Sequence, residues 1–497
     1  MNTSGMRPLI QEIQTAHTPE SLVENLPAER GAVLLRTSAF DSPQARYSFV
    51  AARPFLTFRS SGSQCEITRC FSSPVRHVQF GNPWQLLDAL LARYELLDEV
   101  DLPFPLGGCF GTWGYGLKNF VEPKLSCLAV DDLELPDCHV GFYDSLVVFD
   151  HRLAKAFVVS TGLVADGSRS EKRAGEQLEF WRVALTSEGD AIRRPESAAI
   201  VKHAQYSNAT GKTISNLSRA DFLAAVERAR RYIRAGDIYQ VNLSQRLTAP
   251  CGFSGWELFQ RLAAVSPAPF SAYLDCGDFQ MASSSPELFL RLSGSHIRTR
   301  PIKGTRPRGA DPTRDAQLAY ELQTSAKELA ELVMITDLLR NDLGKVCEFG
   351  SVQTPELARL ERFAQVQHLV STVEGRLRKD VTHLAALAAC FPGGSITGAP
   401  KFRAMEIIDE LEPLARGPYC GCHGYLGFNR ESQLSITIRT AICQNSLAHF
   451  SVGAGIVADS VPEAEYAETL AKAAGFLAAL EGRFPASFTR LSMSRPA

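Results

Sequence analysis

The chain has 497 residues, of which 45% are hydrophobic and 21% are charged, and its formal net charge is −2. This composition is typical of a soluble globular protein, and the near-neutral charge argues against nucleic acid or a membrane surface as partner. No apolar run is long enough to span a membrane, the first residues lack the apolar core of a signal peptide, and twelve cysteines without a paired framework favour a reducing compartment, so we expect a cytoplasmic protein.

Residues 1–160 alternate short strand-like runs with turns rich in glycine and proline. The runs are "GAVLLRT", "YSFVAA" and "YDSLVVFD". Residues 161–217 are polar and rich in serine, glycine and charge, so we interpret them as a connecting segment. Within this segment, the spacing of apolar residues predicts a helix over 171–185.

Residues 218–480 follow a different pattern, in which helices flank groups of strands. Ser218 is a candidate N-cap, with Asp221 three residues later and apolar residues at helical spacing beyond it. The remaining pattern predicts strands at 239–247, 270–292, 424–428, 434–444 and 448–459, helices at 324–345 and 462–480, and a tail at 481–497. This order indicates an α+β fold with mainly antiparallel sheets and helices outside them.

Two pairs of acidic residues have a spacing that places both members on one helix face. Glu328 and Glu331 are three residues apart, as are Glu465 and Glu468. Brought together, the two faces would offer four carboxylates, an all-oxygen site that suits Mg²⁺. The alternative is two solvated helix faces, and the spacing alone does not exclude it.

Three further features suit an anionic ligand. The loop "PGGSITGAPK" (392–401) precedes a helix and offers backbone N–H groups, although a plain turn with a helix cap is the alternative. The small residues of "SVGAGIVADS" (451–460) leave backbone amides accessible, and Arg439 lies in a predicted strand as either a buried structural ion pair or a carboxylate clamp.

Lys303, in "TRPIKGTRPRG", is either a solvated turn residue or an amine held at a pocket, where it can act as a nucleophile.

Seven segments together resemble the chorismate-utilising enzymes, and they occur in the family's order across residues 218–477. They are "AGDIYQVNLSQR", "SSSPELF", "PIKGTRPRG", "ELVMITDLLRND", "FPGGSITGAPK", "RGPYCG" and "GAGIVADSVPEAEYAET". Residues 34–54 are also similar to the family's N-terminal signature. The resemblance implies a large α/β sandwich of two mostly antiparallel sheets with helices outside.

Within this family three reactions use chorismate: ammonia addition at C2 (anthranilate synthase), ammonia addition at C4 (aminodeoxychorismate synthase) and water addition (isochorismate or salicylate synthase). Water-adding members carry a lysine base where this chain has Gln240, and glutamine cannot serve as that base. Anthranilate synthases usually read "PIAGT", whereas Lys303 gives this chain "PIKGT". The resemblance therefore implies C4 amination, with C2 amination as the alternative.

The resemblance also implies a role for each site residue. Lys303 would attack C2 of chorismate while the C4 hydroxyl leaves, Glu287 would be the general acid, and ammonia would then expel the lysine from C4. Glu331 and Glu468 would bind Mg²⁺ directly, with Glu328 and Glu465 holding its waters. The residues implied to surround the substrate are Gly304, Thr305, His368, Tyr419, Arg439, Gly453, Ala454 and Gly455.

A tryptophan pocket is also implied by "SPAPFSAY", with Pro267, Ala268 and Pro269 facing Thr37 and Arg46. The family's "LLES" reads "LLRT" here, so Arg36 replaces an acid, which argues against feedback inhibition and leaves structural tryptophan as an alternative. Because no glutaminase nucleophile motif is found, we expect ammonia from a separate glutamine amidotransferase subunit. A non-catalytic amino-acid sensor is a third alternative, which the filled acidic and basic positions disfavour.

Overall fold

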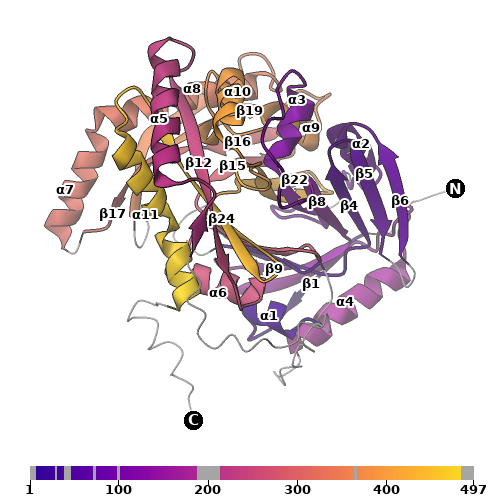
Figure 1. Ribbon diagram of the computed structural model, residues 1–497. Helices are drawn as coiled ribbons and strands as arrows, with labels where there is room; N and C mark the ends of the chain where they lie inside the picture. Colours follow the sequence, from indigo (N-terminus) through magenta and orange to yellow (C-terminus); the bar gives the residue numbers. More distant parts are fainter. Residues whose placement is uncertain are drawn as a thin grey trace.

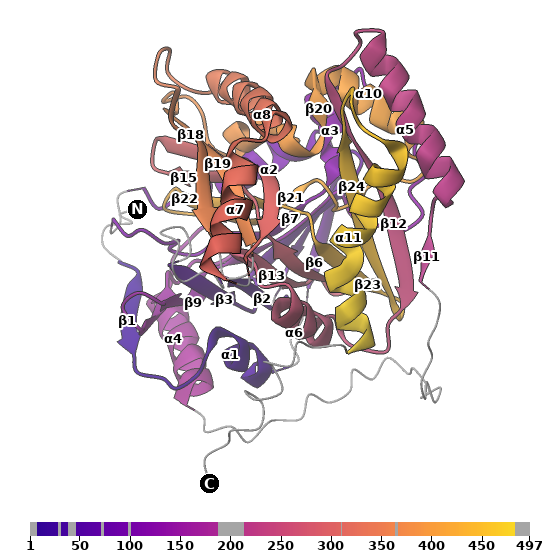
Figure 2. The same ribbon diagram turned by 90° about the vertical axis from the view of Figure 1, so that its left-hand side faces the viewer.

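The computed structural model describes residues 7–27, 31–37, 46–70, 74–97, 101–186, 213–309, 311–362 and 366–482. Within these ranges the chain forms two sheets of twelve strands each. Their neighbouring strands are antiparallel, and helices lie on the outside (Figures 1 and 2). The expected sandwich of two large antiparallel sheets is confirmed.

The first sheet has the strand order β1-β10-β9-β3-β2-β13-β14-β23-β24-β12-β11, and β20 pairs with β12 at its edge. In chain order its strands are β1 (Leu9–Ile13), β2 (Val33–Arg36), β3 (Tyr47–Ala51), β9 (Ser145–Asp150), β10 (Lys155–Ser160), β11 (Ile214–Ser215), β12 (Gln240–Pro250), β13 (Phe270–Asp275), β14 (Gln280–Ser285), β20 (Gly398–Ala399), β23 (Thr440–Gln444) and β24 (Leu447–Ile456).

The second sheet has the order β17-β19-β16-β15-β22-β21-β7-β8-β4-β5-β6, and β18 pairs with β19. Its strands are β4 (Leu56–Ser61), β5 (Gln64–Arg69), β6 (Val75–Phe80), β7 (Gly108–Trp113), β8 (Cys138–Tyr143), β15 (Leu288–Ser293), β16 (His296–Arg300), β17 (Ile302–Pro307), β18 (Gln353–Arg362), β19 (Val366–Arg376), β21 (Cys422–Gly427) and β22 (Glu431–Ile436). Both sheets thus combine strands from residues 1–160 with strands from residues 218–480.

Helices cover the outer faces of both sheets. On the first sheet lie α1 (Pro19–Asn25), α4 (Glu171–Thr186), α5 (Arg219–Arg234), α6 (Gly255–Val265), α10 (Lys401–Leu411) and α11 (Pro462–Glu481). On the second lie α2 (Pro83–Leu91), α7 (Pro312–Gln323) and α8 (Ala326–Gly344), while α9 (His383–Cys390) packs on α2 and α8. The short elements are η1 (Tyr115–Leu117), α3 (Lys118–Val121) and η2 (Gly394–Ile396). No described helix is both long and apolar enough to cross a membrane.

Local sequence signals explain where helices α5 and α8 begin. Ser218 caps α5 by accepting a hydrogen bond from the Asp221 N–H, as predicted. Ser325 caps α8 in the same way, through the Glu328 N–H. The helix expected at 171–185 corresponds to α4. Of the expected tail, residues 483–497 lie outside the described residues.

The strand predicted at 434–444 is wrong, because the chain changes sheet within it. β22 ends at Ile436 in the second sheet, and β23 begins at Thr440 in the first. Arg439 lies in this crossing with a φ of 49°, a left-handed conformation that a regular strand does not contain. The apolar alternation on each side of the crossing looks the same in the sequence, so the break was not visible there. Arg439 therefore lies outside the regular strands, in the segment that connects the two sheets.

Candidate active site

Lys303 lies in strand β17 and not in a solvated turn. Its side chain is 16% exposed, and its Nζ lies 3.8 Å from Glu331 Oε2 on α8. A Cβ placed on Gly455 of β24 would stand 3.8 Å from the same Nζ. The amine therefore reaches from the edge of the second sheet toward the small residues of the first.

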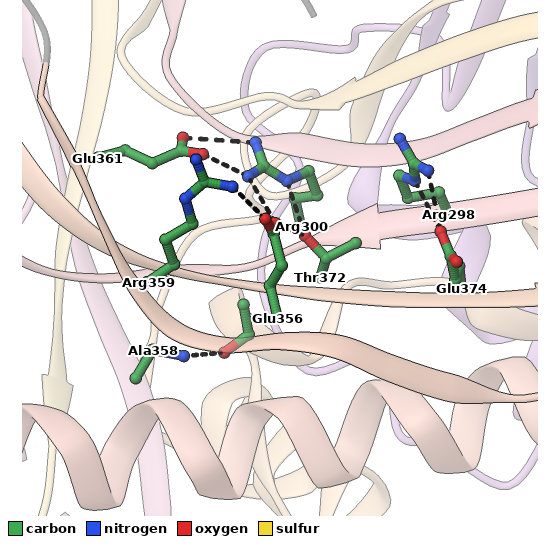
Figure 3. A network of polar contacts seen from close by, with 9 residues as sticks. Arg298, Arg300, Glu356, Ala358, Arg359, Glu361, Thr372 and Glu374 are labelled. Atoms are coloured by element: carbon green, nitrogen blue, oxygen red, sulfur yellow. Dashed lines mark hydrogen bonds and ion pairs between the residues drawn. The ribbon is translucent and has the colours of Figure 1, made fainter. Parts of the chain in front are cut away.

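The arginines that surround Lys303 in the sequence have other partners. Arg300, buried on β16, pairs with Glu361 at 2.5 Å and donates to Thr372 at 3.0 Å, which ties β16 to the β18–β19 hairpin (Figure 3). Arg306 Nη1 lies 3.6 Å from Glu328, and Arg308 Nε lies 2.8 Å from Asp315. Lys303 is thus the cation of this stretch that faces Glu331.

A bulge at Gly304 sets the direction of β17. The pairing with β19 shifts register between Lys303 and Thr305, and Gly304 has a φ of 67°. A Cβ on Gly304 would lie 2.6 Å from Leu322 Cδ1 and 3.1 Å from Glu328 Oε2. Only glycine lets the strand approach α7 and α8 this closely, because it has no Cβ and tolerates the left-handed conformation.

The two acidic pairs come from helices α8 and α11 and lie within electrostatic reach of each other. Burial raises the pKa of Glu331, the neighbouring carboxylates Glu328 and Glu468 raise it further, and Lys303 opposes the shift. Burial also raises the pKa of Glu465, again with Glu468 adding to the effect. Glu331 on α8 and Glu468 on α11 therefore interact electrostatically, while Glu468 itself stays 49% exposed.

Lys472 links Glu468 on α11 to strand β24 of the first sheet. Its Nζ lies 2.8 Å from Glu468 Oε1 and donates a hydrogen bond of 2.7 Å to the Gly453 carbonyl on β24. We did not single out this lysine from the sequence, although its position four residues after Glu468 is the spacing of a helical ion pair.

The carboxylates suit a divalent cation by their chemistry. Carboxylate oxygens are the ligands that Mg²⁺ prefers. The raised pKa values of Glu331 and Glu465 come chiefly from burial, with a smaller contribution from Glu468. Among the residues that the structure describes, no three acidic, histidine or cysteine side chains are gathered closely enough to hold an ion as they stand. The chemistry of the donors therefore suits Mg²⁺, although the described side chains do not form a ready ligand cluster.

Glu287 lies in the connection between β14 and β15 and is buried. Burial raises its pKa, while hydrogen bonds from Ser395 and the Ile302 N–H and the charge of Lys303 lower it. A carboxyl group with a raised pKa can hold and deliver a proton near neutral pH. Ser395 comes from the loop 392–401, which we selected for its backbone N–H groups and not for this side chain.

The loop 392–401 is hydrogen-bonded to strand β12. Gln240 pairs with Ala399 and Val241 with Gly398, and the Asn242 N–H donates to the Thr397 carbonyl at 2.8 Å. These bonds hold Ser395 against the site from the side of the first sheet.

His368, Thr305 and Arg439 form a second group of polar side chains in the site. His368 Nδ1 lies 2.9 Å from Thr305 Oγ1. Burial, with the nearby charge of Arg439, lowers the pKa of His368 to about 4, so its imidazole is neutral at pH 7. Burial lowers the pKa of Arg439, and the charge of Glu287 opposes this shift. Arg439 therefore lies within electrostatic reach of both His368 and Glu287.

The floor of the site consists of glycines on β24. A Cβ on Gly453 would lie 2.9 Å from Tyr419 Oη, and a Cβ on Gly455 would lie 2.6 Å from Gln240 Nε2. Ala454, between them, is buried in the core beneath α5 and α10, so its side chain points the other way. Gln240 Oε1 is buried and has no hydrogen-bond partner in the described part of the chain. A bound polar molecule would satisfy it.

The residues assigned to a tryptophan pocket are only partly together. Thr37 and Pro269 line a narrow cavity of about 20 Å³ that also borders His423, and the Thr37 hydroxyl and His423 Nε2 are buried without a partner among the described residues. Arg46 is instead ion-paired with Asp150 at 2.6 Å. Of the other two, Pro267 is exposed, and the Ala268 carbonyl accepts a hydrogen bond from Ser271.

We predict that Gly304→Ala destabilises the protein more than Gly294→Ala. Both glycines have positive φ, at 67° and 54°, but a Cβ on Gly294 meets nothing within 4 Å. Gly294→Ala should cost about 1–2 kcal/mol of unfolding free energy from backbone strain, and Gly304→Ala about 2–5 kcal/mol because overlap with Leu322 adds to it. Chemical denaturation measures both, and equal losses would contradict the close approach of β17 to α7.

We also predict that His368 contributes to the pH dependence of stability. Its folded pKa of about 4 is below the value of about 6.5 for an unfolded chain, so the unfolded state binds the proton more tightly. The free energy of unfolding should fall as the pH drops from about 6.5 to about 4, by about 1.4 kcal/mol per pH unit for this proton. His368→Gln should make the slope shallower by that amount in denaturation curves. An unchanged slope would mean that His368 is not buried in the neutral form.

Comparison with known proteins places these residues in a family. The model of the chorismate binding enzymes matches residues 36–478. Anthranilate synthase component 1 of Acetivibrio thermocellus is 37% identical over 466 residues (93% of each chain), and aminodeoxychorismate synthase component 1 of Escherichia coli K12 is 39% identical over 457 residues (90% of this chain, 93% of the relative).

Among solved structures, anthranilate synthase component I from Streptococcus pneumoniae TIGR4 superposes with a TM-score of 0.72 at 31% identity, covering 88% of this chain and 93% of that one. The menaquinone-specific isochorismate synthase from Escherichia coli shares the fold with a TM-score of 0.69 at 18% identity, covering 96% of this chain and 95% of that one. The sequence match over most of the chain and the shared two-sheet architecture agree, and the chain belongs to the family of chorismate binding enzymes.

Proposed function

We propose that this chorismate-utilising enzyme adds ammonia at C4 of chorismate to give 4-amino-4-deoxychorismate, the precursor of 4-aminobenzoate in folate biosynthesis. The position of the Lys303 amine carries the proposal. It lies 3.8 Å from Glu331 and within electrostatic reach of Glu287, beside the glycine floor of the site. Relatives named anthranilate synthase and aminodeoxychorismate synthase match at similar identity. Lys303 is therefore the feature that favours ammonia addition at C4 over addition at C2.

In the proposed reaction the neutral Lys303 amine forms a bond to C2 of chorismate. The two conjugated ring double bonds shift from C1=C2 and C5=C6 to C1=C6 and C4=C5, the C4–O bond breaks, and Glu287 gives its proton to the departing hydroxyl, which leaves as water. Ammonia then forms a bond to C4, both double bonds shift back, and the lysine nitrogen leaves C2 with the bonding electron pair. The enolpyruvyl group is retained, so another enzyme would have to eliminate pyruvate.

The other residues would bind and orient chorismate. Tyr419, Arg439 and the amides of residues 453–455 would contact its two carboxylates, and neutral His368 with Thr305 would lie beside the ring. For Mg²⁺, Glu331 and Glu468 would be direct ligands, while Glu328 and Glu465 would hold its waters. When bound, the ion would neutralise the ring carboxylate.

Ammonia would come from a glutamine amidotransferase subunit. Tryptophan bound near Thr37 and Pro269 is a further part of this proposal. The cavity there, about 20 Å³, would have to open to admit it, and the ligand would then satisfy the buried Thr37 hydroxyl, which has no partner among the described residues. The alternative reaction is ammonia addition at C2 with loss of pyruvate, which gives anthranilate and needs no lysine nucleophile.

The identity of the product tests the proposal. Purified protein with chorismate, Mg²⁺ and an ammonium salt at alkaline pH should form aminodeoxychorismate, which an added lyase converts to 4-aminobenzoate. Lys303→Ala should lose this product, and Lys303→Arg should lose it too, because arginine keeps the cation next to Glu331 but supplies no nucleophilic amine. Fluorescent anthranilate from the parent protein would refute C4 amination, and full activity of Lys303→Arg would refute the covalent step.

The metal assignment makes a separate prediction. Glu468→Gln should raise the Mg²⁺ concentration needed for half-maximal turnover about tenfold or more, because one carboxylate ligand is lost. Glu463→Gln is the matched control, since Glu463 is exposed in the first turn of the same helix, and it should leave the requirement unchanged. A Glu468→Gln enzyme with the parent's Mg²⁺ dependence would contradict the assignment.

A further inference from the structure

A second cavity lies away from the candidate active site, between helix α2 and the end of the second sheet. It has a volume of about 470 Å³, which is within the range of about 300–1,000 Å³ typical of small-molecule sites. Figure 1 shows α2, β5 and β6 on the opposite side of the molecule from α7 and α11. The lining residues are Leu56, Ile67, Arg69, Val75, His77, Gln79, Leu86, Ala89, Leu90, Arg93, Tyr94 and Ala165.

The cavity exists because α2 is too short to cover three strands. The helix has nine residues, so it is about 13 Å long, and it packs on β5. Strand β6 ends the sheet, and its residues Val75, His77 and Gln79 line the cavity. Val75 and His77 are exposed, and Gln79 is half-buried. The floor and the α2 wall are apolar, and they are formed chiefly by Leu56, Ile67, Leu86 and Leu90.

The open side of the cavity is positively charged. Arg69 at the end of β5 and Arg93 after α2 both lie within electrostatic reach of the Tyr94 ring, and no ion pair within 4.0 Å joins either guanidinium to a described carboxylate. Asp166 is an acidic group within electrostatic reach of Arg69. The Tyr94 hydroxyl already donates to the Ala165 carbonyl at 2.8 Å. The two arginines therefore line an apolar cavity.

We propose that this cavity binds an amphipathic monoanion, a small molecule with an apolar body and one carboxylate or sulfonate. The body would lie against Leu56, Ile67 and Leu90, and the anionic end would lie between Arg69 and Arg93. Guanidinium groups match such an end because they donate two parallel hydrogen bonds to it. The site is independent of the proposed reaction.

The fluorescent probe 8-anilinonaphthalene-1-sulfonate tests the proposal with the full-length protein. Its fluorescence should rise saturably with the parent, and the double variant Arg69→Gln/Arg93→Gln should bind it about tenfold or more weakly. Ala89→Trp, which fills the cavity from α2, should also weaken binding. Arg76→Gln is the matched control: Arg76 lies on β6 next to His77 but points to the other face, where it pairs with Glu66 at 2.6 Å. It should bind the probe as the parent does.

Unchanged circular dichroism, melting temperature and chorismate turnover show that each variant is folded. Parent-like binding by the double variant, or equal weakening by Arg76→Gln, would overturn the proposal, because the probe would then be held elsewhere or by general charge. Absence of saturable binding to the parent would also overturn it.

Discussion

The arrangement of the site depends on one electrostatic constraint: acidic side chains from α8 and α11, two helices far apart in the sequence, lie within electrostatic reach of each other. Like charges repel more strongly where burial removes water, as at Glu331. The structure offsets this repulsion with lysines. Lys303 faces Glu331, and Lys472 pairs with Glu468 while it also donates to the floor of the site. In the proposed enzyme, a bound divalent cation would offset the remaining negative charge.

A second constraint is the absence of side chains where the elements meet. Gly304 lets the bulged strand β17 approach α8, and Gly453 and Gly455 leave room in front of Tyr419 and Gln240. The backbone therefore determines where Lys303 points, and substitutions at these glycines would move the amine even though they change no charged group. The Arg300 network behind β17 keeps the strand in place from the other side.

Much of the fold follows from signals within a few residues of each element. Ser218 and Ser325 cap their helices because a serine hydroxyl satisfies a free N–H there, and the acidic pairs lie on one face because helical periodicity requires it. The break at Arg439 could not be predicted, since the apolar residues on each side continue the same alternation although the chain changes sheet. Lys472, Ser395 and the Arg69–Arg93 cavity depend on contacts between distant segments, and spacing along the chain does not report such contacts.

The most direct test of the central claim is a search for the covalent adduct on Lys303. Protein, Mg²⁺ and chorismate are mixed without ammonia, quenched rapidly and digested, and the peptides are analysed by mass spectrometry. The account predicts that the peptide with Lys303 gains the mass of chorismate less one water, and that ammonia added before the quench removes it. Product formation with no adduct on that peptide, at times when turnover is under way, would contradict a lysine nucleophile.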